Sequence, residues 1–214
     1  MSQPAETPGK PYHHGDLRGH LLRVVRDLIE TDGPDGFSVA EAARRAGVSS
    51  AAPYKHFRDR AEILHAIASD ALERLGKAMA ESAAPFPRGS IEAVAALGKA
   101  YIDFAHTEPG IFRLTFGLTE GQEQDPALME KGRATFGIVK QEVAAVLGLP
   151  VAHLHVQRGA YLLWTVVHGH SFLGIDCKNT QEVGQIKDWD LLLAAGQAVL
   201  GREAQLAAQT DRER

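Results

Sequence analysis

Apolar residues recur at steps of three and four along most of the chain, and this spacing constrains the fold more than any other feature. In the first such segment they stand at Leu17, Leu21, Val24, Val25, Leu28 and Ile29. Steps of this size place side chains on one face of an α-helix. No stretch alternates apolar and polar residues convincingly, and clusters of β-branched residues are scarce. The sequence therefore predicts an all-α chain of about nine helices.

Capping residues mark where several of these helices begin. Asp16 precedes the first helical segment, where its carboxylate can accept from free backbone amides. Ser38 with Glu41, and Asp59 with Glu62, form two capping-box patterns. Each pattern predicts a helix that begins one residue after its Ser or Asp.

Breaks in the helical pattern divide the chain into parts. The first twelve residues hold three prolines and a glycine, and they lack a helical period. A short helix is expected after Pro109, and two long apolar helices are expected at 153–173 and 188–200. The expected parts are a flexible arm at 1–12, a compact head at 13–60, a helical body at 61–200 and a polar tail at 201–214.

The composition limits the classes of protein to consider. The 214 residues, 44% of them hydrophobic, suffice for one core, or for one core and a small satellite domain. The formal net charge is −4, so the whole chain is no basic nucleic-acid coat. Nine Lys and Arg stand against eight Asp and Glu up to Arg60, and fourteen stand against nineteen beyond it. A mildly basic head on an acidic body is a weak indication of a polyanion bound at the head.

Cysteine usage and hydropathy indicate the compartment. Cys177 is the single cysteine, which excludes an internal disulfide and favours a reducing environment. The N-terminus lacks the apolar run of a signal peptide, and no apolar run reaches the roughly eighteen residues of a membrane span. We therefore expect a cytoplasmic chain with no membrane partner.

The string GVSSAAPYKHF, residues 47–57, follows a short helix and has the composition of a helix-turn-helix. Gly47 tolerates the positive φ that the turn needs, and Val48 fills the angle between the helices. A second helix that approaches base edges needs a small first turn, which Ser50, Ala51 and Ala52 supply. Its next residues can donate to phosphates while an aromatic ring returns to the core. These residues are Tyr54, Lys55, His56 and Phe57.

An ordinary helical hairpin in a bundle is the alternative interpretation of the same string, because alanine and glycine also serve close packing. The exposed run from Tyr54 to His56 favours the helix-turn-helix, since a bundle has no use for it.

The segment AARRAGVSSAAPYKHF, with Arg60 soon after it, resembles the DNA-binding domain of TetR-family transcriptional regulators over residues 17–64. The resemblance implies phosphate contacts from Ser38 and Tyr54, helped by His56 and Arg60. It also implies that base edges face Ser49, Ser50, Ala51, Ala52 and Lys55. Pro53 departs from the family pattern, which more often has leucine there. Direct readout should then depend on Lys55, Ser50 and methyl contacts to thymine.

The two long helices at 153–173 and 188–200 carry apolar residues all around their axes. One face should pack inward and the other should meet a second copy, as in a two-fold four-helix bundle. This agrees with the dimer mode of the resembled family. A charge at Val167 or Leu192 is then expected to disrupt the homodimer. Trp164, His168 and Gly169 resemble a Trp-x-x-x-His-Gly motif of one subgroup.

Aromatic residues of the middle helices could line a chamber for a small, largely apolar effector. They are equally what a helical core would contain. The candidates, with the polar His168 beside them, are Tyr101, Phe104, Phe112, Phe116, Phe136, Tyr161, Trp164 and His168.

The sequence gives little support for an enzyme or for a metal site. The string HGHSFLG lacks the spacing and the preceding strand of a nucleophile elbow. His153 with His155, and His168 with His170, stand two residues apart, so on a helix their side chains diverge and cannot chelate one metal. We expect no catalytic residue, no metal and no cofactor.

The resemblance implies a ligand-responsive transcriptional regulator, a repressor that binds a pseudo-palindromic operator in duplex DNA as a homodimer. Residues 13–60 would form the DNA-binding domain, and residues 61–200 the effector-binding and dimerisation domain. The alternative is a helical protein–protein interaction module that does not bind DNA.

Overall fold

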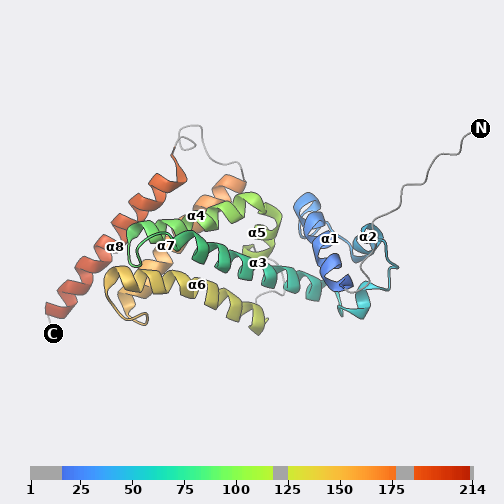
Figure 1. Ribbon diagram of the computed structural model, residues 1–214, viewed down its shortest axis with the longest axis horizontal. Coiled ribbons are helices and arrows are strands. Elements are labelled where there is room, and N and C mark those ends of the chain that lie inside the picture. Colours follow the sequence, from blue (N-terminus) through green and yellow to red (C-terminus); the bar gives the residue numbers. More distant parts are fainter. Residues whose placement is uncertain (1–15, 118–124, 177–185, 213–214) are drawn as a thin grey trace, which may run out of the picture.

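The computed structural model describes residues 16–117, 125–176 and 186–212. Within these residues the chain forms eight α-helices, one short 3-10 helix and no strand (Figure 1). The all-α fold is confirmed, and the helix count is close to the expected nine. The elements are α1 (Leu17–Asp32), α2 (Val39–Arg45), η1 (Pro53–Lys55), α3 (Arg60–Ala83), α4 (Ile91–Thr107), α5 (Pro109–Phe116), α6 (Pro126–Leu147), α7 (Leu154–Ile175) and α8 (Asp188–Arg212).

Side chains cap the helices of the head as the local sequence predicts. Ser38 Oγ accepts from the Glu41 amide at 3.1 Å, and the Asp59 carboxylate accepts from the Glu62 amide at 2.8 Å. In a complete capping box the Glu41 carboxylate would also accept from the Ser38 amide. Here it binds Arg44 instead. The starts of α1, α2 and α3 are therefore confirmed at Asp16, Ser38 and Asp59.

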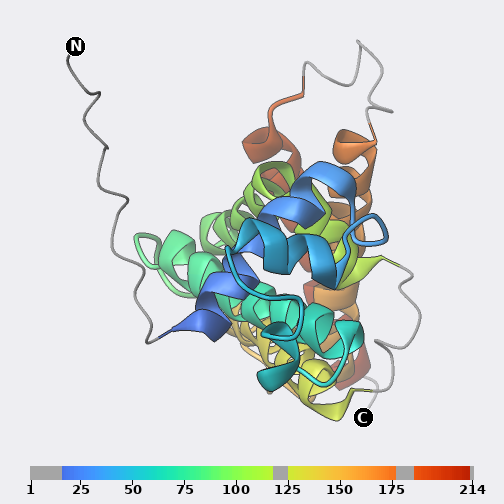
Figure 2. The same cartoon turned by 90° about the vertical axis from the view of Figure 1, so that its right-hand side faces the viewer.

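The head consists of α1, α2, η1 and the start of α3, packed around one apolar cluster. Leu28 and Ile29 of α1 and Phe57 after η1 lie in this cluster. Ile111 and Leu114 of α5 belong to the same cluster, although α5 lies far along the sequence. Figure 2 looks onto the head, with α1 and α2 in front of the body helices. The core of the head is thus completed by one helix of the body.

Helix α3 runs from the head into the body. Its 24 residues span about 36 Å at the rise of an α-helix. Ile63 and Ile67 pack in the head cluster, whereas Leu75 and Met79 pack in the cluster at the centre of the body. In Figure 1, α3 continues from beside α1 toward α4 and α6. A tilt of this one helix would therefore move both regions.

Helix α8 extends beyond its expected end at residue 200 and continues to Arg212. Most of the segment expected as a polar tail is therefore helical. Glu203 and Ala207 are buried in this extension. Their spacing of four residues places both on one face, which packs on the bundle.

Candidate nucleic-acid interface and body cavity

The turn after α2 has the geometry that a helix-turn-helix requires. Gly47 has a φ of 69°, which glycine adopts without steric strain. Its amide donates to the Arg44 carbonyl at 3.1 Å, and the Val48 amide donates to the Ala43 carbonyl at 3.0 Å. These two bonds form a Schellman motif that ends α2. The predicted turn at Gly47 is confirmed.

The second helix of the motif is shorter than expected and is a single 3-10 turn, η1. The Ala52 amide donates to the Ser49 carbonyl at 2.9 Å, and the Lys55 amide donates to the Ala52 carbonyl at 3.2 Å. Both bonds join residues three apart, as in a 3-10 helix. Pro53 has no amide hydrogen and cannot donate to the Ser49 carbonyl, so an α-helical turn lacks one of its bonds there.

Short and polar side chains surround η1 on its outer surface. Tyr54 is 58% exposed, whereas Phe57 is 2% exposed and packs in the head cluster, as predicted. The other expected contact residues near it are exposed or half-buried: Ser49, Ser50, Ala51, Ala52, Lys55 and His56. No ion pair joins Lys55 to the described part of the chain. This surface therefore presents a free cation and several hydrogen-bond donors.

Arg60 has an internal role that the sequence pattern did not indicate. Its guanidinium binds the carbonyls of Pro34 and Phe37 and lies 4.8 Å from the centre of the Phe37 ring. These contacts fasten the start of α3 to the turn between α1 and α2. Ser38 is exposed at the same turn, where its hydroxyl accepts the capping bond and keeps its hydrogen free to donate.

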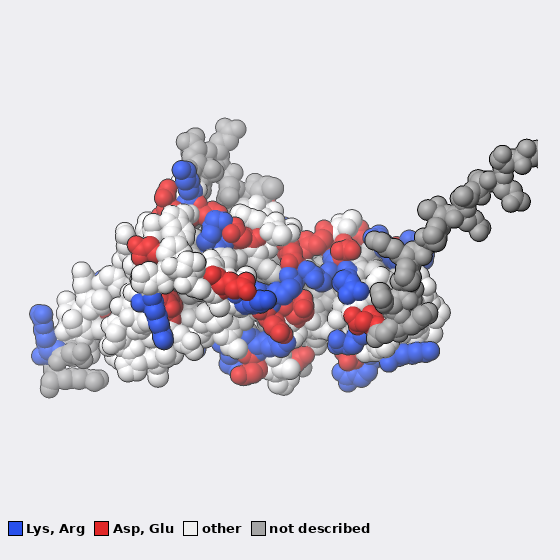
Figure 3. All heavy atoms as spheres, viewed as in Figure 1, with Lys and Arg blue, Asp and Glu red and all other residues white. Residues whose placement is uncertain are grey.

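Two arginines of α2 add positive charge that the sequence analysis did not assign to the site. Arg44 and Arg45 both bind the Glu41 carboxylate, at 2.7 and 2.9 Å. Their hydrogen bonds lower the pKa of Glu41 to about 2. The three residues therefore carry a net charge of +1 at neutral pH. Figure 3 shows basic side chains along the outer edge of the head.

The head and the body are joined by a cluster of ions around Glu108. Arg26 of α1 binds Glu108 at 2.9 Å, and Arg74 of α3 binds it at 3.0 Å. Asp70 also binds Arg74, at 2.8 Å. Since Glu108 directly precedes α5, this cluster connects α1, α3 and α5. Sequence reasoning missed it because its members are far apart in the chain.

Glu30 of α1 caps α5 from outside that helix. Its two carboxylate oxygens accept from the amides of Gly110 and Ile111, each at 2.9 Å. These amides belong to the first turn, where no carbonyl of the same helix is available. A Cβ atom at position 110 would lie 2.5 Å from the Ile29 carbonyl oxygen, so only glycine allows this approach. The head and α5 are therefore in direct backbone contact.

A third carboxylate, Glu203 of α8, lies at the far end of the body and is 3% exposed. It binds His155 at 2.7 Å and Arg158 at 2.8 Å, both from α7. Burial raises the pKa of Glu203, but the hydrogen bonds from Arg158 and His155 outweigh it and hold the pKa below its usual value. The ionised Glu203 carboxylate therefore links α7 to α8.

The body contains a cavity of about 270 Å³ that is lined by residues of α3, α4, α5, α6 and α7. Of the eight predicted effector residues, four line it: Tyr101, Phe116, Phe136 and Trp164. The remaining lining residues are Leu72, Leu75, Met79, Gly132, Arg133, Thr135 and Val139. Half of the predicted residues therefore line one cavity.

The other four predicted residues lie outside the lining of this cavity. Phe112 is completely buried and packs against Tyr101 and Phe172, so it belongs to the core. Phe104 lies beneath the Arg74 guanidinium. Tyr161 is 58% exposed and does not line the cavity, although its ring lies beside that of Trp164, with ring centres 6.1 Å apart.

His168 supports the cavity wall from behind Tyr101. Its Nδ1 lies 2.9 Å from the Tyr101 hydroxyl. Burial raises the pKa of Tyr101 and lowers the pKa of His168. Both groups are therefore neutral at pH 7, and a single hydrogen is shared between the hydroxyl and Nδ1. Trp164 stands one turn before His168, with ring centres 5.1 Å apart, whereas Gly169 faces outward.

No group of three or more metal-binding side chains forms among the described residues. None of the described helices is both long and apolar enough to span a membrane.

A helix-turn-helix head with an exposed basic turn, mounted on a helical body, defines a DNA-binding transcriptional regulator. Residues 21–67 match the family described as bacterial regulatory proteins of the tetR family, and residues 94–181 match the tetracyclin repressor-like C-terminal domain. The chain belongs to the TetR family of transcriptional regulators.

Solved structures share this fold. A protein of unknown function from Rhodococcus sp. RHA1 is 30% identical, with a TM-score of 0.75 over 90% of this chain and 97% of that one. A tetR-family transcriptional regulator from Streptomyces coelicolor has a TM-score of 0.69 at 14% identity, over 88% and 82% of the two chains. FadR from Bacillus subtilis, solved in complex with stearoyl-CoA, has a TM-score of 0.65 at 13% identity, over 87% and 97%. None of the curated proteins matches the chain.

Proposed function

We propose that the protein is a ligand-responsive repressor that binds a pseudo-palindromic operator as a homodimer. The exposed surface around η1 carries this proposal, because it places Tyr54, Lys55 and His56 beside a correctly formed turn. Ser38, Tyr54 and His56 contact phosphates, and Arg60 holds the turn that positions Ser38. The residues that face base edges are Ser49, Ser50, Ala51, Ala52 and Lys55.

Operator binding is tested with promoter fragments from the protein's own gene, titrated at one salt concentration by fluorescence anisotropy. Lys55→Ala should lower affinity and relax the preference at one base pair by about 1–3 kcal/mol. Lys77→Ala is the matched control, since this lysine lies on α3 in the body and is exposed. If Lys55→Ala and Lys77→Ala bind every fragment as the wild type does, η1 is not the recognition element.

The homodimer is proposed to form through the outer faces of α7 and α8. Large apolar side chains of α7 are exposed there: Leu154, Tyr161, Leu162 and Leu173. The exposed positions of α8 include small residues that permit close approach: Ala194, Ala198, Gly201 and Ala208. Two such helices from each copy would form a four-helix bundle. Half-sites would then lie about 34–36 Å apart, or more if the heads are splayed.

The structure changes which substitution tests the dimer. Val167 and Leu192 are 9% and 5% exposed and face the interior of the body, so a charge at either position would disrupt the core. Leu162→Glu instead places a charge on the exposed face of α7. Light scattering at micromolar concentration should show a dimer for the wild type and a folded monomer for this variant. A monomeric wild type would contradict the proposal.

The effector response is proposed to pass through α5. Phe116 at the end of α5 lines the cavity, and the start of α5 is held by Glu30 of the head. A ligand that displaces Phe116 would therefore move α1 as well as α3. A coupling of about 1.4–2.7 kcal/mol lowers operator affinity tenfold to a hundredfold. The FadR complex with stearoyl-CoA supports the idea that this kind of fold can hold a ligand.

The effector response is tested by screening small apolar molecules for both thermal stabilisation and release of operator DNA. Phe116→Ala and Trp164→Ala should weaken the action of any active compound. An effector whose action survives both substitutions unchanged acts from another site.

A further inference from the structure

The cavity lined by Tyr101, Phe116, Phe136 and Trp164 is apolar within and carries charge at a single point. Arg133 alone carries a charge among the described residues that line it. The Thr135 hydroxyl already donates to a backbone carbonyl, either of Lys131 at 3.0 Å or of Leu72 at 3.2 Å. The Tyr101 hydroxyl is used by His168. The interior therefore suits a hydrocarbon, and only the position of Arg133 suits a charged group.

Arg133 can exchange its present partner for a ligand. Its Nε and Nη2 atoms both bind one oxygen of Glu130, at 3.0 and 2.8 Å. Both side chains are more than 60% exposed, and an ion pair in water contributes little to stability. A guanidinium matches a carboxylate in shape and charge, since it offers two parallel donors. A carboxylate at the cavity can therefore compete for Arg133.

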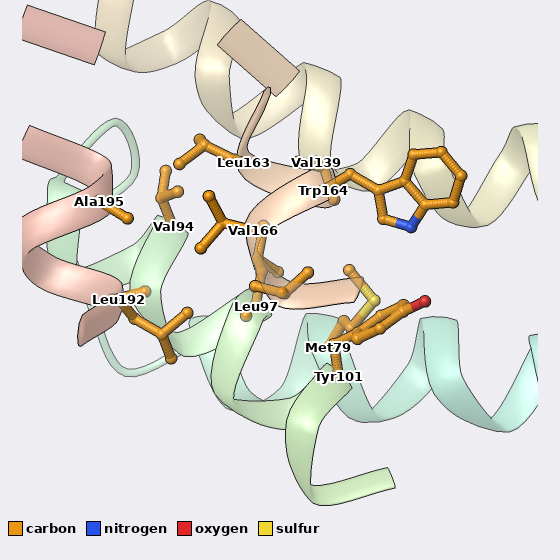
Figure 4. A pocket seen from close by; sticks show the side chains of 13 residues that line it. Met79, Val94, Leu97, Tyr101, Val139, Leu163, Trp164, Val166, Leu192 and Ala195 are labelled. Carbon is orange, nitrogen blue, oxygen red and sulfur yellow. The ribbon is translucent and has the colours of Figure 1, made fainter. Parts of the chain in front are cut away.

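A second, smaller cavity of about 40 Å³ lies behind the first. Four side chains line both cavities: Met79, Tyr101, Val139 and Trp164. Figure 4 shows Met79, Tyr101 and Trp164 together on one side of the small cavity, with Val94, Leu192 and Ala195 on the other. At roughly 10–15 Å³ for each water-sized group, the space takes about three methylene groups.

The wall between the two cavities can open. Methionine is unbranched and flexible, so Met79 can change rotamer at little cost. Its movement would join the two spaces into one channel. The channel would run from Arg133 at one end to the apolar side chains around Ala195 at the other.

From this geometry we infer that the effector is an elongated aliphatic carboxylate. Its carboxylate binds Arg133, its chain passes between Tyr101, Phe136 and Trp164, and its end fills the small cavity past Met79. The inference rests on the proposed effector response and names the chemical class of ligand for that site.

The experiment uses a series of straight-chain carboxylic acids of increasing length, with the corresponding methyl esters and alcohols as neutral controls. Binding to the full-length protein is measured by calorimetry, and operator release is measured separately by anisotropy. Affinity for the acids should rise about fourfold with each added methylene. It should fall again once the chain exceeds the joined cavities.

Two variants test the two ends of the channel. Arg133→Gln should weaken binding of the acids about tenfold and leave the alcohols unchanged. Lys131→Gln is the matched control, because Lys131 is a cation two residues away on α6 that binds Glu73 and does not line the cavity. Ala195→Leu fills the small cavity, so the preferred chain should become about two carbons shorter while short acids bind as before.

The outcomes separate the ligand class from the regulatory function. Equal binding of acids and neutral analogues, with operator release by both, overturns the carboxylate class and leaves the effector response standing. Selective binding of acids without operator release supports the class and overturns the proposed response. If no member of the series binds, or if Arg133→Gln and Lys131→Gln weaken acids equally, the inference is wrong.

Discussion

Glu108 and Glu203 are both carboxylates held by arginine between packed helices, but they connect different numbers of elements. Glu203 joins only α7 to α8, and it is nearly sealed from water. Glu108 joins α1 and α3 to the start of α5, and it is partly exposed. The sealed cluster pins two helices together, whereas the exposed one lies between the cavity and the head. Glu203 therefore stabilises the body, whereas Glu108 is placed to transmit a movement from the cavity to the head.

The Glu108 cluster can rearrange at little cost. Arg74 binds both Glu108 and Asp70, so it can keep one partner while it loses the other. Charge–charge contacts near water are also less dependent on exact geometry than packed apolar contacts. Glu203 has no such freedom, because a shift of α7 would leave an ionised group buried without its partners.

Removal of the sealed carboxylate should give the largest effect. Glu203→Ala leaves His155 and Arg158 without their acceptor, and we expect the free energy of unfolding to fall by about 2–3 kcal/mol. This loss of stability is smaller than for a fully buried ion pair because Arg158 is partly exposed to water. Denaturant unfolding measures it, with the exposed Gln205→Ala as control. The ratio of operator affinities with and without effector should stay the same in protein that remains folded.

Removal of the cap on α5 should give a smaller loss of stability and a larger loss of coupling. Glu30→Ala leaves the amides of Gly110 and Ile111 without an acceptor, which costs about 1–2 kcal/mol. The matched control is Asp27→Ala, an exposed acid on the same helix. The fold-change in operator affinity on adding effector should shrink for Glu30→Ala only. An unchanged fold-change would show that α5 does not transmit through α1.

Helix caps and turns could be predicted from the sequence, whereas contacts between distant segments could not. The caps at Ser38 and Asp59 and the turn at Gly47 each depend on residues within a few positions, so the pattern alone located them. Glu30 meets Gly110 from 80 residues away, and neither segment by itself shows which residue lies opposite it. The glycine after Pro109 was the one available signal, because a helix start seldom needs glycine.

The same limit explains the outcome for the aromatic residues. Residue type identified them as apolar, but only the rotation of each helix decides which side they face. Tyr161 and Trp164 are neighbours on α7, yet one is exposed and the other lines the cavity. The short turn at η1 has a local cause, since Pro53 has no amide hydrogen to donate to the Ser49 carbonyl.

Acid titration should distinguish the sealed cluster from the rest of the molecule. The pKa of Glu203 is lowered in the folded state, so its contribution to stability is present above the unfolded pKa of about 4.3 and is lost as the pH falls through the folded pKa. Stability measured from pH 7 down to pH 3 should therefore fall more steeply for the wild type than for Glu203→Gln. Parallel curves would mean that Glu203 does not titrate differently in the two states.

The smallest expected effect lies in the head, where neither cluster is disturbed. Tyr54→Phe removes one exposed hydroxyl and leaves the ring, so operator and non-specific DNA should both bind more weakly by about 0.5–1.5 kcal/mol. Stability and the fold-change caused by effector should be those of the wild type, because Tyr54 has no part in the contacts around Glu108 or Glu203. Anisotropy titrations on operator and on scrambled DNA at one salt concentration give both affinities. A loss confined to the operator would assign Tyr54 to base recognition instead, and a changed effector response would show that the recognition surface is itself part of the coupling.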